Sequence, residues 1–244
     1  MDRGERPLLA VLIDADNVPA RNADAILREI SDIGEPALRR VYGDWSSPAL
    51  SGWQEKVRAL GMVAHQQTAN TKGKNASDIG LVIDAMDILH TGRFDGFVLV
   101  SSDSDFTQLA NRLREDGRLV IGIGERKTPP ALRIACNRFI FIENIDGPAD
   151  GGAAVTSGGK GKSKGKDAEA ARLIRAAMGK IDQEDPWFSL GPVGQHIAAA
   201  HPDFDARTYG ARKLSDLVKA LPREFETRAQ GNHLQVRDRR RAGA

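Results

Sequence analysis

The sequence has few cysteines, few aromatic residues and no long apolar run. Its one cysteine, Cys136, excludes a disulfide framework and a thiolate metal site. Aromatic residues make up 5% of the chain, which leaves few side chains on which nucleic-acid bases could stack. The apolar stretch Leu8–Ile13 is too short to cross a bilayer, and no small-residue cleavage pattern follows it. We therefore expect a soluble cytoplasmic protein with no membrane partner.

The chain also lacks a large net charge, because 35 Lys and Arg residues nearly balance 33 Asp and Glu residues. The balance hides an uneven distribution along the chain. Acidic residues cluster in the first half, whereas basic runs occupy Lys160–Lys166 and Arg237–Arg241. Such asymmetry indicates a polyanionic partner. A hydrophobic share of 41% over 244 residues is enough for two separate cores.

Aspartates follow two apolar runs that read as buried strands. Asp14 closes the run Leu8–Ile13, and the run Gly96–Ser101 leads into Asp103 and Asp105. The carboxyl ends of strands in a parallel α/β sheet are where ligands bind. The two strand ends therefore bring acidic side chains to one edge of the predicted sheet.

A third acidic position, Asp78, stands in the first turn of a predicted helix behind the candidate N-cap Ser77. A single aspartate in such a place is more often a helix cap, and we interpret Asp84 and Asp87 as solvated or capping acids. A cluster of carboxylates differs, because the negative charges repel one another unless a cation neutralises them. Oxygen ligands select Mg²⁺ or Mn²⁺ over zinc.

Strand and helix patterns alternate along the first part of the chain. Strands are predicted at 8–13, 38–42, 62–66, 96–101, 118–123 and 139–142, and helices near 20–33, 48–60, 77–90, 105–116 and 130–136. This alternation is typical of an α/β fold with a mostly parallel sheet flanked by helices. We assign this domain to residues 1–145.

A second domain is predicted after a Gly- and Lys-rich stretch without periodicity. Residues 146–166 have the composition of a flexible linker. Residues 167–237 contain three helical patterns, the third over Thr208–Leu221, and a hairpin signal at Gly231–Asn232. This order indicates a small winged-helix-like α+β domain, which residues 238–244 follow as a basic tail.

The first domain resembles the NYN domain, a branch of the PIN-like nuclease superfamily that includes the LabA-like proteins. The resemblance lies in the stretches Leu12–Val18, Lys74–Met86, Phe97–Phe106 and Gly122–Pro129. It implies a metal-dependent ribonuclease that holds Mg²⁺ or Mn²⁺. The residues implied as metal ligands are Asp14, Asp78, Asp103 and Asp105, with Asn17 hydrogen-bonded within the site.

One position departs from the family pattern. Many relatives have glycine where this chain has Ser102. The serine leaves the acidic residues in place, although it could crowd a turn that prefers glycine.

The second domain resembles a LOTUS, or OST-HTH, domain. The resemblance lies in Trp187–Gly191, Pro202–Phe204, Tyr209–Gly210 and Lys213–Leu217. It implies an RNA-binding module, so RNA is the expected partner. Basic residues in two loops of the first domain and around the third helix of the second are candidates for phosphate contacts. They are Lys72, Lys74, Arg126, Lys127, Arg207, Arg212 and Lys213.

These features together predict hydrolysis of RNA phosphodiester bonds by a metal-activated water. Two alternatives stay open. A catalytically silent RNA-binding regulatory adaptor would retain the fold without turnover, although no acid of the set is missing. A phosphoaspartyl phosphatase would use Asp14 and Asp16, but Asn17 and Pro19 suit it poorly and a cap insertion is missing. The sequence also leaves open RNA versus DNA, internal versus terminal cleavage and a homodimer.

Overall fold

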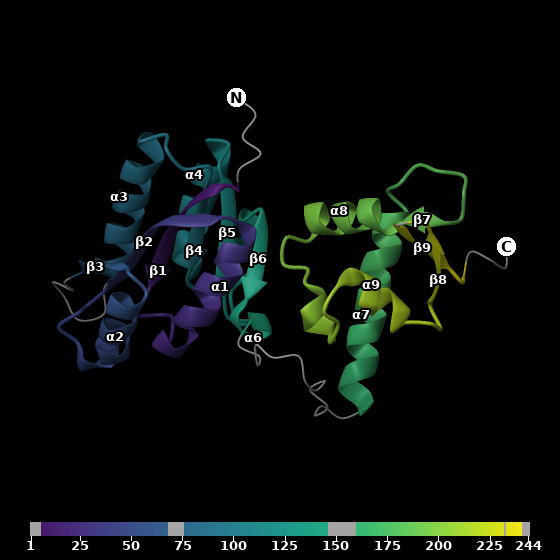
Figure 1. The fold of residues 1–244 in the computed structure, drawn as a ribbon, viewed down its shortest axis with the longest axis horizontal. Helices are drawn as coiled ribbons and strands as arrows, with labels where there is room; N and C mark the ends of the chain where they lie inside the picture. Colours follow the sequence, from purple (N-terminus) through teal and green to yellow (C-terminus); the bar gives the residue numbers. More distant parts are fainter. Residues whose placement is uncertain (1–5, 68–75, 146–159, 232, 241–244) are drawn as a thin grey trace. The chain divides into compact units, whose positions relative to one another are not determined.

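The computed structural model describes residues 6–67, 76–145, 160–231 and 233–240, without the side chains of 76–78 and 160–164. The chain forms two compact units, residues 1–147 and 148–244, each with its own core (Figure 1). No helix in the described part of the chain is long and apolar enough to cross a membrane.

The first unit is built on a six-stranded sheet in which all paired strands are parallel. Its order is β3-β2-β1-β4-β5-β6. The strands are β1 (Leu8–Asp14), β2 (Glu35–Gly43), β3 (Val63–Gln66), β4 (Gly96–Val100), β5 (Leu119–Gly124) and β6 (Arg138–Phe141). The predicted parallel α/β fold is confirmed.

Helices cover both faces of this sheet (Figure 1). On one face pack α1 (Ala23–Ile33), α2 (Ser51–Ala59) and α6 (Ile142–Ile145), and on the other α3 (Ala76–His90), α4 (Thr107–Glu115) and α5 (Pro130–Ala135). Short 3₁₀ turns are η1 (Ala20–Asn22), η2 (Pro48–Leu50) and η3 (Ser104–Phe106). In β1, Leu9 and Val11 face the first set of helices and Ala10 and Leu12 the second. Burial on both faces explains why the central strands are continuous apolar runs.

The chain changes direction across the sheet between β1 and β4. From β1 it proceeds outward through β2 to β3, and from β4 it proceeds the other way through β5 to β6. Neighbouring strands whose connections diverge leave a crevice at their carboxyl ends, where ligands of open α/β sheets bind. Asp14 is the last residue of β1, and its neighbour Ile13 pairs in register with Val100 of β4. The fold therefore places Asp14 at this switch point.

The second unit combines helices with a small antiparallel sheet. Its elements are α7 (Lys160–Met178), β7 (Phe188–Ser189), α8 (Leu190–Ala200), η4 (Ala206–Tyr209), α9 (Leu214–Lys219), β8 (Phe225–Gln230) and β9 (His233–Asp238). The sheet order is β7-β9-β8. Ile174, Val193, Leu217 and Val236 lie in one buried core. The predicted small α+β domain with a terminal hairpin is confirmed.

Two predicted boundaries in this unit were wrong. The third helix over Thr208–Leu221 is in fact η4 followed by α9, because Gly210 adopts a left-handed conformation with φ of 81° and ends the first turn. The predicted linker extends too far, since α7 already begins at Lys160. The rest of that linker, residues 146–159, lies outside the described residues.

Candidate active site

Asp14 is a buried carboxylate with hydrogen-bond donors on both oxygens. Its side chain ends β1 and the residue is 1% exposed. Oδ1 accepts hydrogen bonds from the backbone N–H groups of Asp16 (3.2 Å) and Asn17 (3.3 Å), which form the turn after the strand. Oδ2 accepts from Asn17 Nδ2 (2.7 Å) and Ser101 Oγ (2.8 Å). These contacts fix the orientation of the carboxylate.

The environment of Asp14 acts on its ionisation in two directions. Burial raises the pKa of the Asp14 carboxyl, and the hydrogen bonds from Ser101 and Asn17 partly oppose this rise. The result is a pKa above the ordinary value. A carboxylate that is desolvated in this way gains more from a nearby cation than an exposed carboxylate does.

Ser101 connects the ends of β1 and β4. Its hydroxyl donates to Asp14 and accepts a hydrogen bond from the backbone N–H of Asp103 at 3.1 Å, and the residue is 3% exposed. No role was predicted for Ser101 from the sequence. The register could have revealed it: because Ile13 pairs with Val100, the residues that follow them, Asp14 and Ser101, come together.

Asp103 and Asp105 lie in the loop that Ser101 opens. Asp103 is the N-cap of η3, and its Oδ1 accepts a hydrogen bond from Asp105 N at 2.9 Å. Asp103 is half-buried and Asp105 exposed. The hydroxyl of Ser102 accepts from Glu125 N at 2.9 Å, so it joins this loop to the end of β5. The serine that departs from the family pattern therefore has a structural partner.

Asp78 stands in the first turn of α3, as predicted. Because β3 ends at Gln66 and α3 runs back across the sheet towards β4, the helix begins at the same sheet edge as Asp14. The side chain of Asp78 and the predicted RNA contacts Lys72 and Lys74 lie outside the described residues.

The predicted metal site stays a prediction. Among the described side chains, no three Asp, Glu, His or Cys residues lie close enough to hold a metal ion, so Asp14, Asp103 and Asp105 do not form one by themselves. The donors at this edge are carboxylate, hydroxyl and amide groups. Oxygen donors of this kind suit Mg²⁺ or Mn²⁺.

Helix α3 is attached to the sheet beside Asp14. Tyr42 pairs with Asp14 in the β1–β2 register, and its hydroxyl donates a hydrogen bond to Asp84 of α3. Arg40 forms an ion pair with the same carboxylate. Burial and the bond to Asp84 raise the pKa of Tyr42, so its hydroxyl remains a donor. The interpretation of Asp84 as a solvated or capping acid was wrong, because the acid anchors α3 to β2.

Two of the basic residues predicted in the first unit, Arg126 and Lys127, contact protein groups. Arg126 donates from its backbone N to Glu143 Oε1 (2.9 Å) and from Nη2 to Asn144 Oδ1 (2.7 Å), and its guanidinium lies 5.4 Å from the ring centre of Phe141. Lys127 pairs with Glu125 at 2.7 Å while its side chain is 74% exposed. Both residues are exposed and follow β5 at the carboxyl edge of the sheet.

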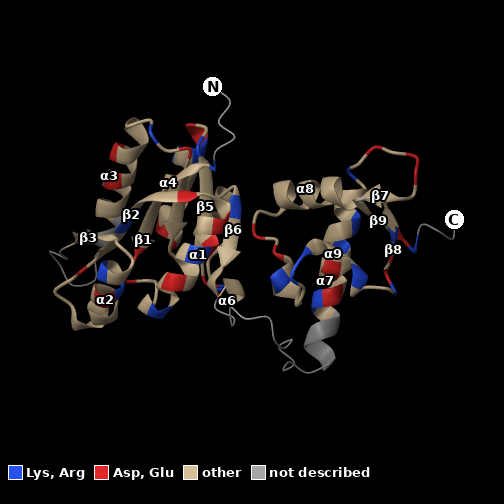
Figure 2. Cartoon of the chain, in the orientation of Figure 1, with Lys and Arg blue, Asp and Glu red and all other residues tan. Residues whose placement is uncertain are grey.

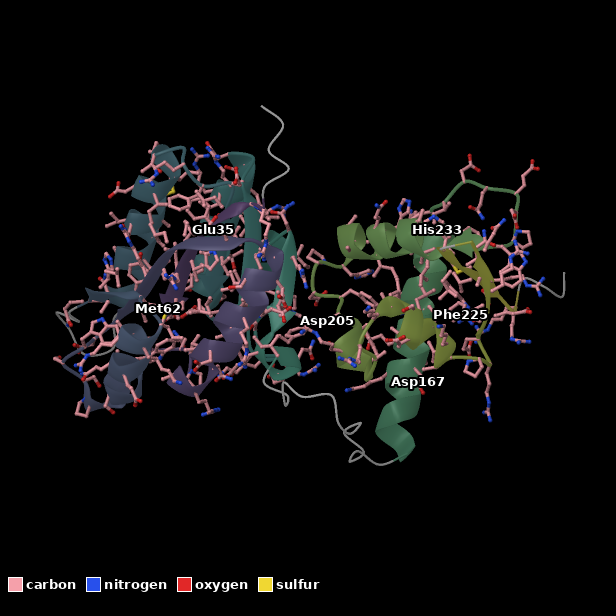
Figure 3. The ribbon with its side chains drawn as sticks, in the orientation of Figure 1. Glu35, Met62, Asp167, Asp205, Phe225 and His233 are labelled. Carbon is pink, nitrogen blue, oxygen red and sulfur yellow. The ribbon has the colours of Figure 1, made fainter. Side chains whose placement is uncertain are left out.

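The predicted basic residues of the second unit differ from one another. Figure 2 shows Lys and Arg positions on several elements of this unit. Arg207 pairs with Asp205 at 2.7 Å, and Asp205, labelled in Figure 3, also caps η4 through Arg207 N. Arg212 and Lys213 are exposed just before α9. Arg207 therefore has a structural partner, and Arg212 and Lys213 are exposed to solvent.

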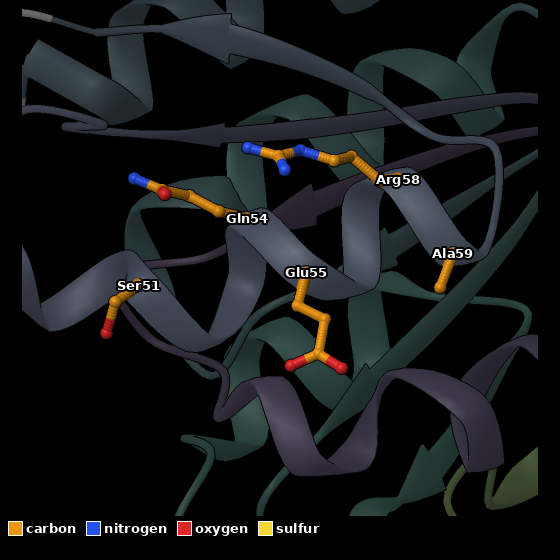
Figure 4. A pocket seen from close by; sticks show the side chains of 5 residues that line it. All are labelled: Ser51, Gln54, Glu55, Arg58 and Ala59. Carbon is orange, nitrogen blue, oxygen red and sulfur yellow. The ribbon is translucent and has the colours of Figure 1, made fainter.

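A hollow on α2 lies apart from these residues (Figure 4). Its lining comes from a single helix, so it is an open surface feature, with a volume of about 510 Å³. The lining residues are Ser51, Gln54, Glu55, Arg58 and Ala59. None of the predicted site residues belongs to it.

A six-stranded parallel sheet flanked by helices is consistent with a PIN-like α/β fold. Residues 8–143 match the family profile of the NYN domain, and the chain belongs to this family. Residues 161–236 match the OST-HTH/LOTUS domain. The predicted order of the two domains is confirmed.

Among solved structures, the chain matches a Vibrio parahaemolyticus protein of unknown function. The two chains share 21% identity with a TM-score of 0.49, and the match covers 57% of this chain and 94% of that chain. No curated protein matches this chain.

Proposed function

We propose that this protein is a metal-dependent ribonuclease whose second unit binds RNA. The observation that carries the proposal is the buried carboxylate of Asp14 at the switch point, joined through Ser101 to the Asp103 loop. Membership in the NYN family supports nuclease chemistry, and the OST-HTH/LOTUS domain supports RNA as the substrate.

In this proposal Asp14 and Asp103 bind Mg²⁺ or Mn²⁺ directly, and Asp78 and Asp105 bind it directly or through water. The bound cation would supply Lewis-acid stabilisation of the scissile phosphate and lower the pKa of an attacking water. Asn17 and Ser101 hold the Asp14 carboxylate in one orientation and favour its ionised form. No side chain acts as a nucleophile.

The test is cleavage of labelled single-stranded RNA by purified protein in Mn²⁺, in Mg²⁺ and in EDTA. We expect cleavage that requires metal, is lost in Asp103→Asn and is retained in Asp87→Asn. Asp87 is a matched control because it is an exposed aspartate on α3. Cleavage that persists in EDTA or in Asp103→Asn would reject the proposed site.

An RNA-binding adaptor without turnover is a second candidate. The observation in its favour is that the described acidic side chains do not converge into a three-ligand group. The same experiment separates the two functions. RNA that is bound but stays intact in all metals would favour the adaptor, with the OST-HTH/LOTUS domain as the active part.

A further inference from the structure

The second unit has a hollow lined by arginines at the start of its hairpin. Its volume is about 320 Å³. We call it the arginine pocket, and its lining residues are Ala168, Ala171, Arg172, Arg175, Glu224 and Arg240. Arg172 and Arg175 were given no role from the sequence, and Arg240 was noted only as part of the basic run Arg237–Arg241.

Helix α7 forms one wall of the arginine pocket. Ala168, Ala171, Arg172 and Arg175 follow one another at the spacing that places residues on one face of a helix. The two alanines are small and leave space between the arginines and the opposite wall. That wall consists of Glu224, just before β8, and Arg240, just after β9. A backbone hydrogen bond from Arg239 N to Glu224 O (3.1 Å) holds these two ends together.

Arg175 is fixed at the base of the arginine pocket. It forms an ion pair with Glu224, and its Nε donates to Asp238 Oδ2 at 3.0 Å. Its guanidinium also lies 5.2 Å from the ring centre of Phe225, a residue labelled in Figure 3. Two carboxylates therefore compensate the charge of Arg175, whose side chain is 20% exposed.

The other two arginines are available at the rim. Arg240 lies 3.2 Å from Glu224, a carboxylate it shares with Arg175, and its side chain is 70% exposed. Arg172 is exposed and has no ion pair among the described residues. The three arginines therefore outnumber the two carboxylates, Glu224 and Asp238, that pair with Arg175 and Arg240, which leaves one positive charge uncompensated. Figure 2 shows the basic positions on α7 and the hairpin.

We propose that the arginine pocket binds a backbone phosphate of RNA, with Arg172 and Arg240 as the contacting residues. The proposal rests on the RNA-binding role proposed for this unit. A planar guanidinium can donate two parallel hydrogen bonds to a phosphate, a geometry that a lysine ammonium lacks. No aromatic side chain lines the pocket, so the contact would position the RNA without reading its sequence.

The experiment measures binding of a fluorescent single-stranded RNA by the full chain carrying Asp103→Asn, which keeps the RNA intact. Affinities are recorded between about 50 and about 200 mM salt, where phosphate contacts give a steep dependence. The pocket variant is Arg172→Gln with Arg240→Gln. The matched control is Lys180→Gln with Lys219→Gln, which removes the same charge from exposed positions of this unit outside the pocket. Arg175 is left unchanged, because its loss would leave Asp238 and Glu224 without their partner.

The pocket variant should bind RNA about tenfold more weakly, with a salt slope reduced by about 1 to 2, while the control keeps its slope. Its melting temperature should stay within a few degrees of the parent, which separates lost contacts from lost folding. Equal slopes in the pocket and control variants would overturn the proposal. If Arg212→Gln with Lys213→Gln alone reduced the slope, the phosphate contact would lie before α9 and RNA binding would stand. A parent chain that binds no RNA would reject RNA binding as well.

Discussion

At the scale of single residues, the charge of Asp14 is costly to the fold. Burial raises its pKa, so the folded protein holds this proton more tightly than the unfolded chain does. The cost is present when the pH lies above the folded pKa and disappears as the pH falls below the ordinary value of 3.8. A site that needs a desolvated carboxylate thus gives up stability for function.

We therefore predict that Asp14→Asn abolishes cleavage and raises the melting temperature of the metal-free protein at neutral pH. The amide keeps an oxygen for the backbone donors of Asp16 and Asn17 and removes the buried charge. Thermal melts across pH in EDTA provide the measurement, and the advantage of the variant should shrink as the pH falls towards 3.8. A variant less stable than the parent at pH 7 would show that the hydrogen bonds to Asp14 outweigh its desolvation.

Replacing Ser101 should reduce stability and cleavage more than replacing its neighbour Ser102. Ser101→Ala removes a donor from Asp14 and leaves the Asp103 N–H without its acceptor. Since both partners are at least partly buried, the free energy of unfolding should fall by about 1–3 kcal/mol, and cleavage should fall with it. Ser102→Gly loses only the acceptor for Glu125 N and should retain more activity. The two variants are compared by denaturant unfolding and by their cleavage rates. Equal cleavage rates would argue against a role for Ser101 in positioning the acids.

At the scale of elements, Tyr42 and Arg40 of β2 attach α3 to the sheet through Asp84, and we predict that this attachment affects the proposed metal site. Tyr42→Phe removes the hydroxyl that donates to Asp84, which should lower the free energy of unfolding by about 1 kcal/mol. Because Asp78 stands on the same helix, the variant should also need more Mn²⁺ for half-maximal cleavage. Asp87→Asn, on the same helix, is the control. Reduced stability with an unchanged Mn²⁺ requirement would limit this contact to a structural role.

Elements with a clear apolar pattern could be predicted from the sequence. The wrong or missing predictions, at Gly210, Ser101 and Asp84, have particular physical causes. Leu8–Asp14 is an apolar run that ends in an acid, and Gly96–Val100 is an apolar run that acids follow within a few residues, so both strands and the edge they share could be predicted. The break at Gly210 was missed because Tyr209 and Leu214 fit one helical face on either side of it. The contacts of Ser101 and Asp84 depend on strand register and on packing between distant segments, which local pattern does not encode.

At the scale of the whole molecule, the two units have separate cores and should divide catalysis from substrate capture. A chain limited to residues 1–147 retains β1, β4 and α3, and with them every acid proposed for the metal site. A tethered RNA-binding unit raises the effective concentration of substrate without changing the chemical step. The shortened chain should therefore keep kcat within about threefold of the full chain, and its KM for long RNA should rise by about tenfold or more. For a substrate of a few nucleotides, the rise in KM should be smaller. The test is steady-state kinetics of both chains on both substrates. Circular dichroism checks that the shortened chain is folded. A folded fragment with a large loss of kcat would mean that the second unit contributes to the active site itself.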